Sequence, residues 1–157
     1  MKSDRSLLWA VSLLGASFIL SLGLYLLLPG HWVRTVLRFP HEITHSLVPE
    51  ARSLSFGWDQ EHNIELLTRE ILLGPARHDH LRLFARQAEL RAVLWRNGVV
   101  YVDLKRDSLI PDADVVFSPA VALKVLKATL MDNFGGISDV RISVEGEPPG
   151  GNYVDKG

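Results

Sequence analysis

The chain has 157 residues, enough for one domain with an appendage, and its formal net charge is −1. A charge this close to zero gives no overall attraction to nucleic acid or anionic lipid, so no nucleic-acid partner is expected. The sequence contains no cysteine, which excludes disulfide bonds, a thiolate zinc site, a cysteine nucleophile and a lipid-modified cysteine anchor.

The first predicted element is a membrane-spanning helix. No charged residue occurs from Ser6 to Gly30. As a helix, Leu7–Leu28 would extend about 33 Å, enough to cross a hydrocarbon core of about 30 Å. A secretory signal has a shorter apolar run that ends at a small-residue cleavage site, whereas this run ends in Leu-Leu-Leu-Pro-Gly. We therefore predict an uncleaved transmembrane helix over residues 7–28.

The orientation of this helix is set by few charges. Lys2 and Arg5 precede the helix and Arg34 and Arg38 follow it, so the number of positive side chains is the same on both sides. The positive charge of the N-terminal amine shifts the balance toward a cytoplasmic N-terminus. We predict a cytoplasmic tail over residues 1–6, a single pass through the inner (cytoplasmic) membrane, and a C-terminal domain outside the cytoplasm. Small residues at i,i+4 spacing in the span could also permit helix–helix contact, which leaves homo-oligomerisation open.

Residues 29–50 are interpreted as a juxtamembrane linker. Trp32 and the neighbouring arginines suit a membrane interface, and apolar residues recur in a loosely helical way. Pro40 and Pro49 divide the stretch into short pieces.

This linker contains the sequence His41-Glu42-Ile43-Thr44-His45, which matches the H-E-x-x-H motif. On a helix, its two histidines can bind one zinc ion while the glutamate acts as general base. Pro40 lets a helix only begin here, and no third ligand, which catalytic zinc needs, follows at a recognised spacing. We expect no metal, cofactor or catalytic residue; a membrane-anchored zinc hydrolase, with His41 and His45 as candidate ligands, is the alternative hypothesis.

A folded domain is predicted over residues 51–146. Asp59 is a plausible cap of its first helix, and Gly74-Pro75 ends that helix. Asn97-Gly98 predicts a two-residue hairpin turn that pairs Trp95 with Val100 and Val93 with Val102. The predicted strands and helices alternate in the order β-α-β-β-α-β, over residues 52–58, 61–73, 89–96, 99–105, 119–134 and 139–145.

This order predicts an α+β fold, a two-layer sandwich with helices on one face of a mainly antiparallel sheet. The proline- and glycine-rich residues 147–157 are predicted to be a disordered tail.

Four short blocks resemble the GerMN domain of bacterial sporulation and germination proteins: Arg69–Pro75 (REILLGP), Asn97–Leu104 (NGVVYVDL), Ala122–Leu130 (ALKVLKATL) and Asp139–Gly146 (DVRISVEG). The resemblance covers about residues 51–146. It departs at Leu83–Leu90 (LFARQAEL), where many members carry a turn of the type Ile-Pro-x-Gly-Thr. The family implies a membrane-tethered or lipidated extracytoplasmic domain, similar to the ring-building modules of envelope assemblies and without an established catalytic centre.

The segment 77–106 is locally basic, and Arg82, Arg86 and Arg96 are the candidate partner-binding surface; an ordinary solvated surface is the other interpretation. The partner would be an envelope protein or an anionic cell-wall polymer.

The histidine cluster His78-Asp79-His80 is interpreted as a surface loop. We predict a non-catalytic binding or scaffolding module in envelope assembly, sporulation or germination, and a small-molecule or glycan receptor remains a further hypothesis.

Overall fold

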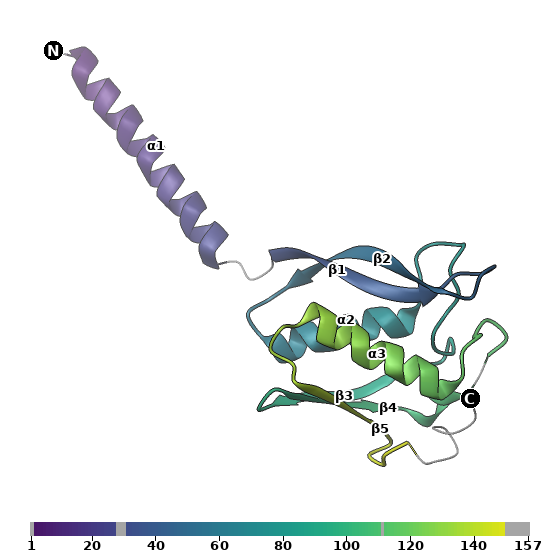
Figure 1. Ribbon diagram of the computed structural model, residues 1–157. Helices are drawn as coiled ribbons and strands as arrows, with labels where there is room; N and C mark the ends of the chain where they lie inside the picture. Colours follow the sequence, from purple (N-terminus) through teal and green to yellow (C-terminus); the bar gives the residue numbers. More distant parts are fainter. Residues whose placement is uncertain (1, 28–30, 111, 150–157) are drawn as a thin grey trace.

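The computed structural model describes residues 2–27, 31–110 and 112–149 of the chain (Figure 1). In chain order the elements are α1 (Lys2–Leu27), β1 (His31–Pro40), β2 (Leu47–Phe56), α2 (Gln60–Leu73), β3 (Leu90–Arg96), β4 (Val99–Leu104), the 3-10 helix η1 (Arg106–Leu109), α3 (Pro119–Asn133) and β5 (Asp139–Val144).

Helix α1 stands apart from the rest of the described chain (Figure 1). Its segment Leu7–Leu27 has a mean hydropathy of 2.1 and is 0% buried. This is the length and composition of a membrane anchor or a signal sequence. Residues 2–6, predicted as a tail, continue the helix, whereas the predicted last residue of the span, Leu28, lies outside the described residues.

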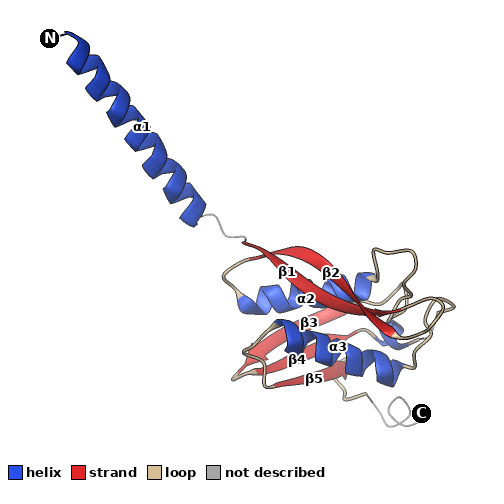
Figure 2. Ribbon diagram, turned by 45° about the horizontal axis from the view of Figure 1, so that its top comes forward, coloured by secondary structure: helices blue, strands red, loops and turns tan. Residues whose placement is uncertain are grey.

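The folded part has three layers, in which α2 and α3 lie between two sheets (Figure 2). One sheet is the β1–β2 hairpin and the other has the order β3-β4-β5. Side chains from both sheets and both helices form one core, which includes Leu37, Phe39, Leu67, Val100 and Leu126. The predicted α+β class and its order of elements are confirmed. The number of layers differs from the expected two, because the first predicted strand, which is part of β2, pairs with β1 in a separate sheet and does not join the β3-β4-β5 sheet.

The interpretation of residues 29–50 as a linker is wrong for the described part of that stretch. His31–Pro40 forms β1, which pairs antiparallel with β2 from His31↔Phe56 to Pro40↔Leu47. Thr35, Leu37 and Phe39 point into the core and are buried, while Trp32, Arg34 and Val36 point outward. Buried and exposed side chains alternate with the two-residue period of a strand. The sequence did not show this period, because apolar residues lie on both faces of β1.

The second half of the domain follows local signals in the sequence. Asn97 and Gly98 have φ values of 52° and 79°, as a tight hairpin turn requires, and the predicted pairs Trp95↔Val100 and Val93↔Val102 are confirmed. After α3, strand β5 pairs parallel to β4. The Asp59 side chain accepts a hydrogen bond from the Glu61 N–H at 3.0 Å, so the predicted helix cap is also confirmed.

Candidate functional site

The H-E-x-x-H sequence forms the turn of the β1–β2 hairpin and not a helix. The His41 ring accepts hydrogen bonds at Nδ1 from the N–H groups of Ile43 (3.2 Å) and Thr44 (3.5 Å). His45 has a φ of 54°, in the left-handed region. The helical geometry that would place both histidines on one face is therefore missing, which removes the basis of the zinc-hydrolase hypothesis. Across residues 2–27, 31–110 and 112–149, no group of three or more potential metal ligands comes together.

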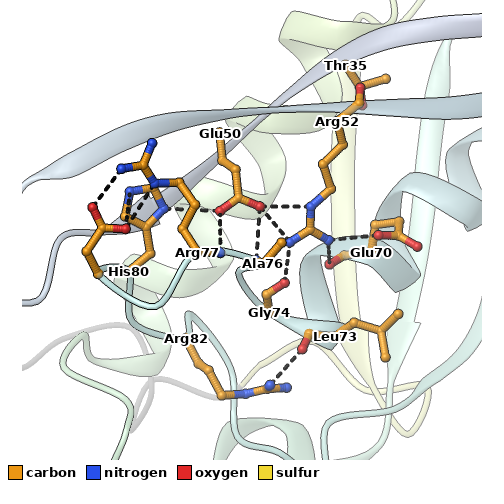
Figure 3. Close-up of polar contacts among 11 residues, drawn as sticks. Thr35, Glu50, Arg52, Glu70, Leu73, Gly74, Ala76, Arg77, His80 and Arg82 are labelled. Atoms are coloured by element: carbon orange, nitrogen blue, oxygen red, sulfur yellow. Dashed lines mark hydrogen bonds and ion pairs between the residues drawn. The ribbon is translucent and has the colours of Figure 1, made fainter.

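A buried carboxylate, Glu50, organises the polar side of the fold (Figure 3). Its side chain is 5% exposed. One oxygen accepts hydrogen bonds from Arg52 Nε at 2.9 Å and from the Ala76 N–H at 3.1 Å. The other accepts from the Arg77 N–H at 3.4 Å and lies 3.1 Å from Nδ1 of the buried His80, which must donate because a carboxylate only accepts. Glu50 thereby fastens β2 to the chain that follows α2.

These contacts decide the protonation state of Glu50. Burial raises the pKa of its carboxyl, but the hydrogen bonds from Ala76 and Arg52 and the charge of Arg52 act in the opposite direction. The net effect is a pKa below the ordinary value, so the carboxylate is ionised at neutral pH.

His80, predicted to lie in a surface loop, is buried, and only His78 of the cluster His78-Asp79-His80 is exposed.

Arg52 extends the network from β2 to the end of α2. Its guanidinium donates to Glu70 Oε2 at 2.8 Å and to the Gly74 carbonyl at 2.6 Å, besides its bonds to Glu50. It also lies over the ring of Phe39, with 5.5 Å between the guanidinium carbon and the ring centroid. Arg52 thus links Phe39 of β1 and Glu50 of β2 to the C-terminal end of α2.

Arg82 caps α2 and is not a free surface residue. Its guanidinium donates to the Leu73 carbonyl at 2.6 Å (Figure 3) and to the Leu72 carbonyl at 2.8 Å. Carbonyls in the last turn of a helix have no acceptor role inside the helix. Gly74 is required beside it: its φ is 91°, and an added Cβ would lie 2.7 Å from Arg82 Nη1. Burial, together with the nearby charge of Arg86, lowers the pKa of Arg82.

Next to this cap is a surface hollow of about 350 Å³, which we call the α2–β3 hollow. Arginine side chains and leucine side chains share its wall. The lining residues are Arg69, Leu72, Leu73, Arg82, Arg86, Ala88, Glu89 and Leu90. Leu73 is 65% exposed, although it directly follows the buried face of α2.

The three predicted arginines do not form one patch. Arg82 and Arg86 line the hollow, and Arg86 is exposed and pairs with Asp114. Arg96 lies at the other end of β3, about 20 Å along the strand from Leu90. Sequence reasoning missed Arg69 and the leucines of the hollow, because helix α2, the loop and β3 bring them together from distant positions.

The wall of the hollow has the chemistry of a binding site for an anionic group. Guanidinium groups pair with carboxylates and phosphates, and exposed leucine side chains accept apolar carbon next to such a group. The lining includes no histidine, serine or cysteine that could act as a base or nucleophile. This composition supports recognition of an anionic group.

Comparison with known proteins identifies the family of this fold. The profile of the Germane family, described as sporulation and spore germination, matches residues 31–150. Its start at residue 31 agrees with the start of β1. No curated protein matches the sequence significantly.

Solved structures of the same fold come from two bacteria. The first GerMN domain of the sporulation protein GerM from Bacillus subtilis matches with a TM-score of 0.57 and 14% identity, covering 74% of this chain and 86% of that one. The tandem GerMN domains of GerM match with a TM-score of 0.54, 17% identity and coverages of 77% and 41%. A protein from Clostridium perfringens assigned as a lipoprotein matches with a TM-score of 0.50, 15% identity and coverages of 83% and 87%. At these identities the likeness is one of fold.

Proposed function

Because the chain belongs to the Germane family of sporulation and spore-germination domains, we propose that it is a non-catalytic module of the cell envelope, tethered to the cytoplasmic membrane and binding a partner outside the cytoplasm. The tether is α1, whose apolar segment is long enough to span a bilayer and is 0% buried by the rest of the chain. The lipoprotein assignment of the Clostridium perfringens structure is consistent with an envelope location.

The observation that carries the binding role is the α2–β3 hollow. Three arginines, Arg69, Arg82 and Arg86, line it beside the exposed Leu73. Arg82 is held by hydrogen bonds to the carbonyls of α2, so its positive charge is already in place before a ligand binds. Binding therefore costs little side-chain entropy at this residue. The partner is an acidic segment of another envelope protein or an anionic cell-wall polymer, and both present carboxylates or phosphates to the arginines.

The experiment changes Arg86, because it is exposed, lines the hollow and caps no helix; its ion pair with Asp114 lies on the surface. We expect Arg86→Glu to weaken binding about tenfold or more, because like charges would face the anionic group. Arg96→Glu is the matched control: it makes the same charge change on an exposed arginine about 20 Å away. Equal loss in both variants, or no loss in Arg86→Glu, contradicts a binding site in the hollow.

Two assays on the full chain in detergent separate the kinds of partner. Sedimentation with cell-wall sacculi, before and after removal of their anionic polymer, measures polymer binding. A photo-crosslinking amino acid at Leu73 captures a protein partner, and the same group at Ile43, which is exposed in the β1–β2 turn and does not line the hollow, is the control. Captured proteins count only if Arg86→Glu removes them.

A further inference from the structure

Two exposed tryptophans lie at one end of the β1–β2 hairpin. Trp32 and Trp58 are each 76% exposed. The register pairs His31 with Phe56 and Trp32 with Ser55, so both tryptophans belong to the open end of the hairpin. The His31 ring meets the Trp58 ring edge-on, with 6.0 Å between centroids. We call these residues, His31, Trp32 and Trp58, the tryptophan end.

The tryptophan end is close to α1 by chain length alone. Helix α1 ends at Leu27 and β1 begins at His31. A chain extends at most about 3.6 Å per residue, so the Cα atoms of Leu27 and His31 lie within about 14 Å of each other. The headgroup layer on each side of a bilayer is roughly 5–8 Å deep. If α1 spans the membrane, the tryptophan end must therefore begin within or just above the headgroup layer.

The chemistry of this end suits that layer. Tryptophan places an apolar ring and an N–H donor on one side chain, and it is enriched where hydrocarbon meets water. Arg34 lies on the same outward face as Trp32, is exposed, and makes no ion pair with any residue that the structure describes. Its guanidinium can pair with a lipid phosphate.

The opposite end of the hairpin provides an internal contrast. The turn carries Ile43, which is 82% exposed, but β1 separates it from His31 by about 30 Å of strand. Exposure of a large apolar side chain therefore occurs at both ends, whereas proximity to α1 and aromatic composition occur only at the tryptophan end.

We propose that the tryptophan end docks in the lipid headgroup layer of the membrane that α1 spans, with Arg34 paired to lipid phosphate. This inference rests on the proposed membrane tether. Docking gives the domain a second attachment, so that the hairpin end is fixed at the membrane and the orientation of the domain relative to the bilayer is restricted.

The four tryptophans of the chain serve as natural probes for this proposal, because they lie at three informative places. Trp9 reports insertion of α1, Trp32 and Trp58 report docking, and Trp95, in β3 of the other sheet, is the control. Full-length variants that keep one tryptophan and replace the others with phenylalanine are reconstituted in phosphatidylethanolamine and phosphatidylglycerol vesicles. Lipids brominated near the headgroup or deep in the acyl chain then quench the fluorescence.

We expect headgroup-proximal bromine to quench Trp32 and Trp58 about twofold or more relative to Trp95, because such quenching acts roughly over the depth of that layer. Trp9 should be quenched by acyl-chain bromine. Arg34→Glu should reduce the quenching of Trp32, while Arg96→Glu should leave it unchanged. Should a chain with one tryptophan fail to fold, the single replacements Trp32→Phe and Trp58→Phe in the natural background give the same signals by difference.

The outcomes separate docking from tethering. Quenched Trp9 with Trp32 and Trp58 as weakly quenched as Trp95 overturns the docking and leaves the tether standing. Blue-shifted but unquenched emission from Trp32 and Trp58 also overturns it, because another protein surface then covers them. An unquenched Trp9 overturns both proposals.

Discussion

At the scale of single residues, Glu50 has the largest structural role among the polar side chains in Figure 3. It accepts hydrogen bonds from the Arg52 side chain and from the backbone after α2, and it faces His80. Removal of its charge would leave the guanidinium of Arg52 half-paired in a mostly buried position. A buried charge that loses its partner is far more costly than an exposed one.

We therefore expect Glu50→Gln to lower the free energy of unfolding by about 3 kcal/mol, as for other buried ion pairs that lose one member. Urea unfolding measured by circular dichroism would show the change. Glu65→Gln is the control, because the exposed Glu65 pair with Arg69 on α2 should contribute at most about 0.5 kcal/mol. Equal effects of the two substitutions would refute a special role for Glu50.

The same substitution predicts a change in pH dependence. The folded chain holds the pKa of Glu50 below its ordinary value of 4.5, so the folded state binds this proton more weakly than the unfolded state. Its stabilising contribution is complete above that ordinary value and is lost as the pH falls through the folded pKa. Natural protein should lose stability more steeply than Glu50→Gln on acidification below about pH 4.5, measured by urea unfolding at successive pH values.

At the scale of elements, β1 belongs to the folded domain. Leu37 and Phe39 are both 0% exposed and cover the helix layer. The Asn133 side chain at the end of α3 also accepts from the Val36 N–H at 3.0 Å and donates to the Val36 carbonyl at 2.9 Å. These two hydrogen bonds occupy the backbone N–H and carbonyl of Val36 and connect β1 to α3. Strand β1 therefore contributes to the core and to the order of the last helix.

A fragment that begins at His31 should consequently fold, and one that begins at Ala51 should not. Loss of β1 removes two fully buried side chains worth about 1.5–3 kcal/mol each, together with the hairpin pairing, from a total stability of about 5–15 kcal/mol. Thermal unfolding followed by near-ultraviolet circular dichroism distinguishes the fragments. A cooperative transition of similar midpoint in the Ala51 fragment would place the domain boundary where the sequence pattern had suggested.

At the scale of the whole molecule, the proposed topology rests on the apolar helix α1. Lys2 and Arg5 lie before the span and Arg34 and Arg38 after it, so charge alone gives little bias. We propose a cytoplasmic N-terminus, which a reporter fused to the C-terminal end of the chain tests directly.

A reporter that is active only outside the cytoplasm, fused after Gly157, should accordingly be active. The same fusion without residues 2–27 should be inactive, because the apolar helix proposed to direct export is then missing. Activity of a cytoplasmic reporter at the same position, with the full chain in the membrane fraction, would reverse the orientation.

Local patterns in the sequence determined much of the fold. The uncharged run predicts α1, and Asn97-Gly98 sets the register of β3 and β4, since only residues that tolerate positive φ fit that turn. The apolar period and end signals of α2 and α3 also act within one or two turns of helix. Four spaced blocks were enough to indicate the family that the profile later matched. These features depend on neighbours in the chain, so one sequence carries them.

The tertiary structure alone decided the rest. Strand β1 takes its identity from pairing with β2 and from the helices it covers, which its mixed apolar pattern did not show. Arg82 became a helix cap, and the α2–β3 hollow formed, only because the chain after α2 returns to the end of that helix. Glu50 was never singled out, since a lone glutamate in a sequence gives no sign of the donors that will surround it. Contacts between residues far apart in the chain depend on the packing of whole elements, and no local pattern encodes them.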